Sequence, residues 1–284
     1  MVLVSVIIPV FEQWDRMGDL LAALDRQTLA RSTFEIIVVD NGSTAIHMPD
    51  NRSDNLELVT CAQPGAYAAR NAGLAHAIGQ WIAFTDADCL PAPDWLESLL
   101  RAAGEGGEKN LIAGRVEMVP ASIDPGIWEV YDLVKGIPQA RYVNSGYAAT
   151  ANLMAPRAAL DAAGGFDATR MSGGDAAFCR VAQAKGYGII YASDAVVRHP
   201  ARGTWHELVT KARRVKGGQM APGTPLRYRL GTLLPPVPAI GRFLASREHP
   251  LRHRVTACMV QLALWGVECG EAIRLLAGGG PERR

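Results

Sequence analysis

Residues 4–10, VSVIIPV, and residues 34–40, FEIIVVD, decide the fold. Both are β-branched apolar runs without polar alternation, as is typical of parallel strands that are covered on both faces of a sheet. Between them, Leu20, Leu21 and Leu24 form an apolar stripe at helical spacing. A strand, a helix and a second strand in this order predict a βαβ unit within an open α/β sheet.

The same alternation of strands and helices continues beyond this unit. We expect strands at 56–61 and 81–86, with an Ala-rich helix at 66–78 between them. A further helix begins at Asp94, where Asp94 and Glu97 have the spacing of a capping box.

The middle of the chain is less regular. Residues 120–147 are an excursion interrupted by Pro and Gly, and they follow a strand predicted at 111–119. The remaining predicted elements are a strand at 148–155, a helix between Pro156 and Gly164, a helix at 175–185 and a strand pair over 188–199.

Residues 201–284 differ from the rest of the chain in charge. They hold 14 Lys and Arg against 5 Asp and Glu, whereas residues 1–200 hold 15 against 23. Residues 206–216 predict a basic helix, and residues 255–277 are apolar but contain two Glu and one Arg. We therefore expect an α/β domain at 1–200 and a basic, partly amphipathic helical tail at 201–284. The tail either binds an anionic membrane surface, or packs on the acidic body, or forms a homodimer.

Composition excludes several classes of protein. Hydrophobic residues make up 49% and charged residues 20% of the chain, which argues against global disorder. No apolar stretch of about 18 residues lacks a charge, and the N-terminus has no signal-peptide pattern. Five cysteines without a C-x-x-C pair argue against a disulfide framework or a zinc site. Free cysteines favour a cytoplasmic location. If the tail binds a membrane, the protein would lie on the inner face of the cell membrane.

Acidic side chains follow three of the predicted strands. Glu12 follows the first strand, Asp40 ends the second, and Asp86 and Asp88 follow the fourth. Ligands of open α/β sheets bind beyond the carboxyl ends of the strands. Paired carboxylates at such an edge can hold a divalent cation that also takes diphosphate oxygens. The sequence therefore predicts a pocket for a cation and a nucleotide.

Five segments, taken in order, resemble family 2 glycosyltransferases and cover roughly residues 2–200. They are VSVIIPVF at 4–11, EIIVVDNGS at 35–43, GAYAARNAG at 65–73, FTDAD at 84–88, and GGFD at 164–167 with GGD at 173–175. The resemblance implies a GT-A fold, a Rossmann-like open mixed sheet flanked by helices, here with a C-terminal helical appendage. It also implies a nucleotide-sugar donor, with UDP favoured, a Mn²⁺ or Mg²⁺ ion and an inverting transfer to a glycan or lipid-linked acceptor.

The resemblance also implies roles in donor binding. Pro9, Phe11 and Glu12 would line the nucleoside pocket, with Glu12 at the ribose. Asp40 would contact the base, although a turn in Asp-Asn-Gly-Ser explains the same residue. Arg70 would lie near the base or the diphosphate.

The resemblance also implies a metal site and a general base. Asp88 would be the principal metal ligand, Asp86 would contact the ribose or the water shell of the ion, and His199 would complete the shell. Asp175 matches the general base of the family, with Asp167 as the alternative. A helix that begins near Asp175 is expected to lower the pKa of its carboxyl group.

The chain departs from the family pattern around Asp175. The family often has Glu-Asp followed by x-Asp, whereas this chain has Gly174 before Asp175 and Ala176-Ala177 after it. A non-catalytic protein that binds sugar nucleotides therefore stays an alternative. A nucleotidyltransferase of related architecture is another, but the chain lacks the basic Gly-rich loop after its first strand. No P-loop, dinucleotide-binding or nucleophile-elbow motif is present, and no nucleic-acid partner is expected.

Overall fold

The computed structural model describes residues 1–49, 53–220 and 224–280. Its internal contacts divide the chain into two units. Unit 1 comprises Met1–Glu117, Ile137–Arg170 and Gly174–His199. Unit 2 comprises Met118–Gly136, Met171–Gly173 and the chain from Pro200 onward. Each unit is described by itself.

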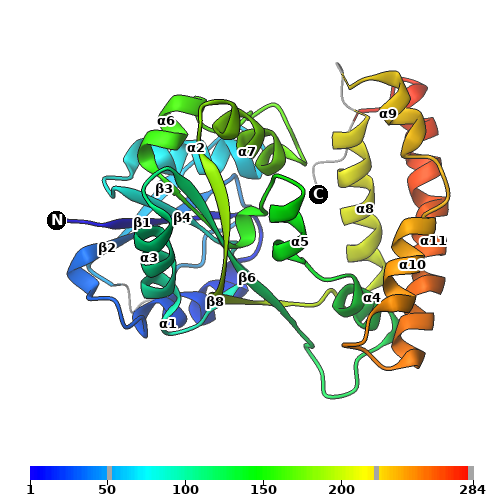
Figure 1. The fold of residues 1–284 in the computed structure, drawn as a ribbon, viewed down its shortest axis with the longest axis horizontal. Coiled ribbons are helices and arrows are strands. Elements are labelled where there is room, and N and C mark those ends of the chain that lie inside the picture. Colours follow the sequence, from blue (N-terminus) through cyan, green and yellow to red (C-terminus); the bar gives the residue numbers. More distant parts are fainter. Residues whose placement is uncertain (50–52, 221–223, 281–284) are drawn as a thin grey trace. The chain divides into compact units, whose positions relative to one another are not determined.

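Unit 1 is built on a mixed sheet of eight strands in the order β3-β2-β1-β4-β7-β6-β8-β5 (Figure 1). The first half of the sheet is parallel, as β1 pairs with both β2 and β4, and β2 pairs with β3. The second half adds antiparallel pairs, β4 with β7, β7 with β6, and β8 with β5. The strands are β1 (Val4–Val10), β2 (Phe34–Asp40), β3 (Leu56–Thr60), β4 (Trp81–Phe84), β5 (Leu90–Pro91), β6 (Asn110–Val119), β7 (Leu153–Pro156) and β8 (Gly188–Pro200).

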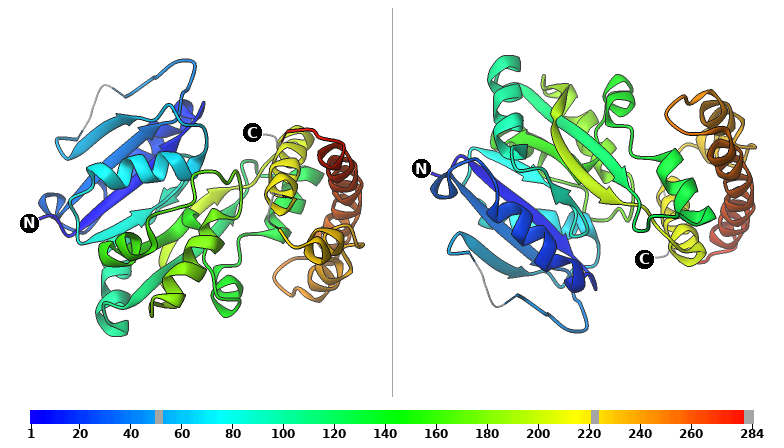
Figure 2. Two further views of the ribbon diagram at one scale, coloured as in Figure 1. Left: turned by 90° about the horizontal axis from the view of Figure 1, so that it is seen from above. Right: turned by 90° about the horizontal axis from the view of Figure 1, so that it is seen from below.

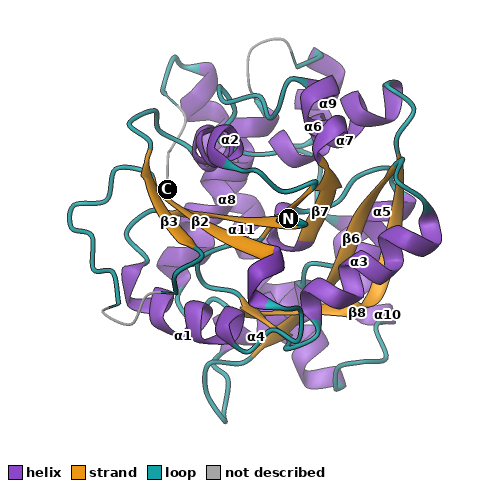
Figure 3. Ribbon diagram, turned by 90° about the vertical axis from the view of Figure 1, so that its left-hand side faces the viewer, coloured by secondary structure: helices purple, strands orange, loops and turns teal. Residues whose placement is uncertain are grey.

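Helices cover both faces of this sheet (Figure 3). Because successive side chains of a strand point to opposite faces, Val6 and Ile8 of β1 join one apolar cluster and Ile7 joins the other. The first cluster includes α1 (Trp14–Asp25) and α3 (Trp95–Gly106). The second includes α2 (Ala66–His76), α6 (Arg157–Ala163) and α7 (Gly174–Ala184). The predicted fold class, an open mixed sheet flanked by helices, is confirmed.

Two predictions about strands were wrong. Residues 188–199 form one strand, because buried Ala192 and Ala195 keep the chain on the sheet on either side of the exposed Ser193 and Asp194. The strand expected from 148 begins only at Leu153, after a 3-10 turn.

The capping box at Asp94 does not form either, and the excursion at 120–147 is more ordered than expected. The carboxylate of Glu97 accepts a hydrogen bond from Thr28 Oγ1 at 2.6 Å instead of reaching back to the helix start. The excursion contains two short helices, α4 (Ile127–Lys135) and α5 (Gln139–Asn144). Both are too brief for a periodic pattern to show in the sequence.

Unit 2 is helical. It contains α4, α8 (Trp205–Gln219), α9 (Leu226–Gly231), α10 (Val237–Ala245) and the 26-residue α11 (Leu251–Leu276). Helix α11 packs on α4, α8 and α10 (Figure 2). The core of the unit contains Tyr131, Leu208, Phe243, Ala257, Val260 and Leu264. Among the described residues, no helix is both long and apolar enough to cross a bilayer.

A buried ion cluster accompanies this helical core. Asp132 is 2% exposed, and its Oδ2 accepts hydrogen bonds of 3.0 Å from the backbone and the guanidinium of Arg202. Lys211 Nζ lies 3.8 Å from Oδ1. Burial opposes ionisation of Asp132, but Lys211 and Arg202 outweigh it and lower the pKa of this carboxyl to about 2. The pair therefore ties α4 to the segment that leads into α8.

In unit 1, Asn152 is a buried polar link between three elements. Its Oδ1 accepts a hydrogen bond of 2.8 Å from Trp95 Nε1 on α3. Its Nδ2 donates to the carbonyls of Arg115 on β6 and Ala195 on β8, each at 2.9 Å. The side chain is 0% exposed, so water cannot replace these bonds.

We expect Asn152→Ala to lower the free energy of unfolding by about 2–4 kcal/mol, because it leaves buried donors and acceptors without partners. Denaturant unfolding of the whole chain measures the change. Asn144→Ala, at an exposed position at the end of α5, is the matched control and should change it by less than about 0.5 kcal/mol. Equal effects of the two variants would contradict the role of Asn152.

Candidate active site

Three acidic residues that were predicted to bind the donor or the cation gather at one edge of the sheet. Strands β1, β2 and β4 run parallel, with Val10 opposite Asp40 and Ile7 opposite Phe84, so their carboxyl ends face the same way. Glu12 follows β1, Asp40 ends β2, and Asp86 follows β4. The register of three strands therefore brings together groups that are far apart in the sequence.

Asp40 is held inside a turn. It is 4% exposed, and its carboxylate accepts hydrogen bonds from Gly42 N at 3.0 Å, from Ser43 N, and from Trp14 Nε1 at 3.3 Å. The turn explanation of this residue thus accounts for most of its hydrogen-bonding capacity. The role of Asp40 in binding the base stays a prediction.

Glu12 is tied to the same turn. Its Oε1 accepts hydrogen bonds from Thr44 N at 2.8 Å and from Thr44 Oγ1 at 2.5 Å, and its own N–H donates to Ser43 Oγ. Glu12 has a φ of 57°, which is an uncommon value for a residue other than glycine. Pro9 and Phe11 lie half-buried on either side of the last residue of β1. These contacts fix the loops that follow β1 and β2 relative to each other.

Arg70 of α2 forms a buried ion pair with Asp86. Its guanidinium is 4% exposed, and Nη2 donates to Asp86 Oδ1 at 2.6 Å. The guanidinium carbon also lies 5.5 Å from the centre of the Tyr67 ring. Its Nε is buried and has no hydrogen-bond partner among the residues that the structure describes. A buried donor of this kind is uncommon in folded proteins.

Asp175, at the start of α7, lies beside this pair. Burial of its carboxyl group raises its pKa, against the lowering effects of the Ala176 N–H, Arg70 and Tyr67, and the charge of Asp86 raises it further. The helix-dipole argument predicted the opposite direction, and it was wrong because desolvation is the larger effect here.

Tyr67 packs against Asp175 and explains a departure from the family pattern. Its hydroxyl donates to Asp175 Oδ1 at 3.4 Å, and burial, with the charge of Asp175, raises the pKa of Tyr67 to about 12. A Cβ at Gly174 would lie 2.6 Å from the Tyr67 ring. The ring therefore occupies the space that an acidic side chain before Asp175 would need.

Asp167, the alternative base, has a different environment. It is exposed, it accepts hydrogen bonds from Thr169 and Arg170, and these bonds lower the pKa of its carboxyl. The segment around it is structural, since Asn71 exchanges hydrogen bonds of 2.7 and 2.9 Å with the backbone of Phe166. The GAYAARNAG and GGFD motifs are thus parts of one packing unit.

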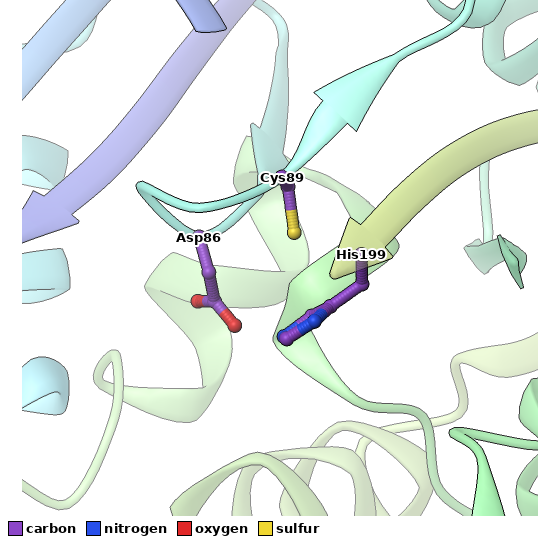
Figure 4. A group of neighbouring side chains, drawn as sticks. All are labelled: Asp86, Cys89 and His199. Carbon is purple, nitrogen blue, oxygen red and sulfur yellow. The ribbon is translucent and has the colours of Figure 1, made fainter. Parts of the chain in front are cut away.

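A cluster of possible metal ligands forms where β4, β5 and β8 meet (Figure 4). Ligand atoms of Asp86, Cys89 and His199 lie within 4.8 Å of one another, and the three side chains point into one space. Asp88 Oδ1 lies 3.7 Å from His199 Nε2 and 4.0 Å from Cys89 Sγ. His199, at the end of β8, is 111 residues from Asp88 in the sequence and 3% exposed.

Cys89, Tyr67 and Trp14 also belong to this site, although they were not among the residues predicted from the sequence. Cys89 directly follows the Asp-Ala-Asp pair, and this adjacency was the available signal. Burial, followed by the charges of Asp88 and Asp86, raises the pKa of the Cys89 thiol well above its usual value. The thiol is therefore protonated at neutral pH when no cation is bound. Tyr67 lies one helical turn before Arg70, on the same face of α2, and this spacing was a signal as well.

Comparison with known proteins identifies the family. The model of glycosyl transferase family 2 matches residues 5–123. Glycosyltransferase AglE of Haloferax volcanii is 34% identical over 224 residues, which are 76% of this chain and 73% of AglE. The chain belongs to glycosyl transferase family 2. It is therefore a glycosyltransferase that depends on a nucleotide sugar.

Other similar proteins are longer than this chain or less similar to it in sequence. A pre-mycofactocin glycosyltransferase of Mycobacterium tuberculosis is 28% identical over 77% of this chain, which spans about half (47%) of that relative. The mannosyltransferase PcManGT of Pyrobaculum calidifontis, solved with GDP-Man and Mn²⁺, superposes with a TM-score of 0.61 at 18% identity, covering 96% of this chain and 86% of PcManGT. TarS 1-349 of S. aureus, solved with UDP-GlcNAc, gives a TM-score of 0.55 at 17% identity, covering 92% and 72%. At these identities the two structures show the shared fold.

The opposite pKa shifts of Asp175 and Asp167 are testable in this family 2 enzyme. We expect the carboxyl of Asp175 to titrate above the usual range of aspartates and that of Asp167 below it. Tyr67→Phe removes a donor to the ionised carboxylate and should raise the pKa of Asp175 further, while leaving Asp167 unchanged. Carboxyl ¹³C resonances followed across pH measure both groups. A Tyr67→Phe variant with an unchanged Asp175 titration would show that the 3.4 Å contact has no electrostatic effect.

Proposed function

We propose that this enzyme transfers a sugar, with inversion, from a UDP-sugar to a hydroxyl of a glycan or lipid-linked acceptor, and that it requires Mn²⁺ or Mg²⁺. The observation that carries the proposal is Arg70. Its buried guanidinium pairs with Asp86, acts electrostatically on Asp175, and keeps an Nε donor without a partner in the described structure. A diphosphate bound at the same edge of the sheet would carry a charge that matches this guanidinium.

The donor set at the edge of the sheet suits such an ion. Carboxylate oxygens of Asp88 and Asp86 and an imidazole nitrogen of His199 are ligands that Mn²⁺ accepts, and oxygen ligands suit Mg²⁺. In the proposal Asp88 is the main ligand, with Asp86 and His199 completing the set. When bound, the cation neutralises charge on the leaving diphosphate.

Asp175 is the proposed general base. The hydroxyl proton of the acceptor passes to the Asp175 carboxylate as the acceptor oxygen bonds to the anomeric carbon, and the bond from that carbon to the diphosphate breaks. The raised pKa of Asp175 favours this role over Asp167, whose pKa is lowered by its own turn. Tyr67 holds the carboxylate in place through its hydroxyl. Pro9, Phe11, Glu12 and Asp40 line the proposed nucleoside pocket.

The decisive experiment incubates the protein with Mn²⁺ and a panel of UDP- and GDP-sugars. Metal-dependent release of the nucleoside diphosphate from one donor supports the proposal, and the panel identifies the sugar and base. Donor binding without turnover, with every candidate acceptor supplied, would favour a non-catalytic binding protein. Release of pyrophosphate would favour a nucleotidyltransferase.

We expect Asp88→Ala to abolish the Mn²⁺-dependent part of UDP binding, because the proposed metal site loses its main carboxylate. Calorimetric titration of UDP with and without Mn²⁺ measures this. Asp94→Ala, at an exposed position whose side chain makes no capping bond, is the matched control and should bind like the parent. UDP affinity that stays equally dependent on Mn²⁺ in Asp88→Ala would refute the assignment of Asp88.

We expect Asp175→Asn to keep donor binding and to lower turnover by about a hundredfold or more, the usual contribution of a general base. Asp167→Asn should stay within about tenfold of the parent. In the parent, turnover should fall as pH drops through the raised pKa of Asp175, because only the ionised carboxylate accepts the proton. Initial rates measured across pH test both effects. A larger loss of turnover in Asp167→Asn than in Asp175→Asn would make Asp167 the general base.

A further inference from the structure

Exposed apolar side chains concentrate in the last helices of unit 2. Of the 20 large hydrophobic residues that are exposed in the described structure, 12 lie between positions 226 and 276. They occur on α9, on the α9–α10 connection, on α10 and, in half of the cases, on α11. An exposed set of this kind on neighbouring elements marks a surface that binds a partner.

Helix α11 is apolar on two sides. Its inner side packs Ala257, Val260 and Leu264 into the core of unit 2. Its outer side carries a set that we call the outer stripe: Leu251, Val255, Met259, Leu262, Ile273 and Leu276.

The outer stripe follows one face of the helix along its length. Its first four members are three or four residues apart, and Ile273 follows Leu262 after eleven residues, or three helical turns. Met259 and Ile273 are each 67% exposed. The helix is about 39 Å long at 1.5 Å per residue. A stripe of that length that does not cross a bilayer suits a helix lying along an interface.

The charges around the stripe select the partner. Arg227, Arg247 and Arg252 are exposed on α9, just before α11 and on its first turn. Three of the four acidic residues that the structure describes after residue 200 are already engaged. Glu207 is in the capping box of α8, Glu268 lies 3.7 Å from Lys216, and Glu271 is held by Arg274 at 2.6 Å.

The remaining described acidic residue, Glu248, is exposed beside Arg247, so arginines outnumber carboxylates on this surface. Such a surface fits an anionic partner better than a second copy of itself. Two copies packed through the outer stripe would bring arginines together with few available carboxylates opposite them. An anionic lipid surface offers both an apolar layer for the stripe and phosphates for the arginines.

We propose that unit 2 binds the surface of an anionic bilayer through the outer stripe of α11, with Arg227, Arg247 and Arg252 at the headgroup phosphates. The helix lies in the plane of the interface. The groove of about 760 Å³ that the α9–α10 connection and α10 form with parts of α8 and α11 has exposed Leu234 and Val237 in its lining, which adds a second apolar surface to the same unit. The proposal deepens the proposed function, because it places a lipid-linked acceptor at the same membrane as the enzyme.

The test is co-sedimentation of the full chain with vesicles of phosphatidylcholine alone or mixed with phosphatidylglycerol. We expect binding to the mixed vesicles, weakened at high salt, and at least about tenfold weaker binding of Val255→Asp/Met259→Asp/Leu262→Asp. Ile46→Asp/Ile78→Asp, at exposed apolar positions of unit 1, is the matched control and should bind like the parent. Arg227→Gln/Arg247→Gln/Arg252→Gln should weaken binding and reduce its dependence on salt.

The outcomes separate this proposal from the donor chemistry. Circular dichroism and donor hydrolysis should be unchanged in the stripe variant, since every substituted side chain is exposed. Equal binding of parent and stripe variant to mixed vesicles, or equal binding to neutral and anionic vesicles, would overturn the proposal. A parent dimer that the stripe variant dissociates, without vesicle binding, would overturn it in favour of a second copy. Each of these results leaves the donor panel untouched.

Discussion

The parallel pairing of β1 with both β2 and β4 is the constraint on which the candidate site depends. It places Glu12, Asp40 and Asp86 at one edge of the sheet. Arg70 of α2 reaches Asp86 at this edge, and it can do so because α2 packs on the same strands through Ala69 and Gly73. A Cβ atom at position 73 would lie 2.7 Å from a methyl group of Ile7 and 3.0 Å from one of Val39. A glycine at this position therefore lets α2 pack closely on the sheet, and this close packing places the guanidinium of Arg70.

Much of this arrangement could be predicted from the sequence, because its signals are local. The apolar runs at 4–10 and 34–40 became β1 and β2 with the same bounds. The apolar stripe around Leu20 and the Gly164 stop also correspond to observed helices. The candidate site residues followed from strand ends and family motifs. The structure places Asp86 and Cys89 close to His199, and Asp88 lies 3.7 Å from the same histidine. Their roles remain proposals.

What the sequence did not reveal depends on contacts between distant segments. The direction of the Asp175 pKa shift follows from burial under Tyr67 and neighbouring groups, and no local pattern encodes burial. The use of Glu97 by Thr28, rather than by its own helix, is likewise a tertiary contact. Helices α4 and α5 escaped prediction because they span only nine and six residues, which is too few for a periodic pattern to show in the sequence.

The packing of Tyr67 against Gly174 has a consequence for descent within the family. A larger residue at 174 can appear only if the aromatic ring at 67 shrinks or moves, since a single Cβ already comes within 2.6 Å of it. Although the two positions lie 107 residues apart, this contact means that they should change together across homologues. An aromatic residue at 67 should occur with a small residue at 174, and an acidic residue at 174 should occur with a smaller residue at 67. Enlarging position 174 first would pass through an overpacked intermediate. The size of the residue before the proposed base therefore depends on the residue at position 67 of α2. Positions 67 and 174 together would distinguish homologues in which a tyrosine hydroxyl contacts the base from homologues in which a second carboxylate lies beside it.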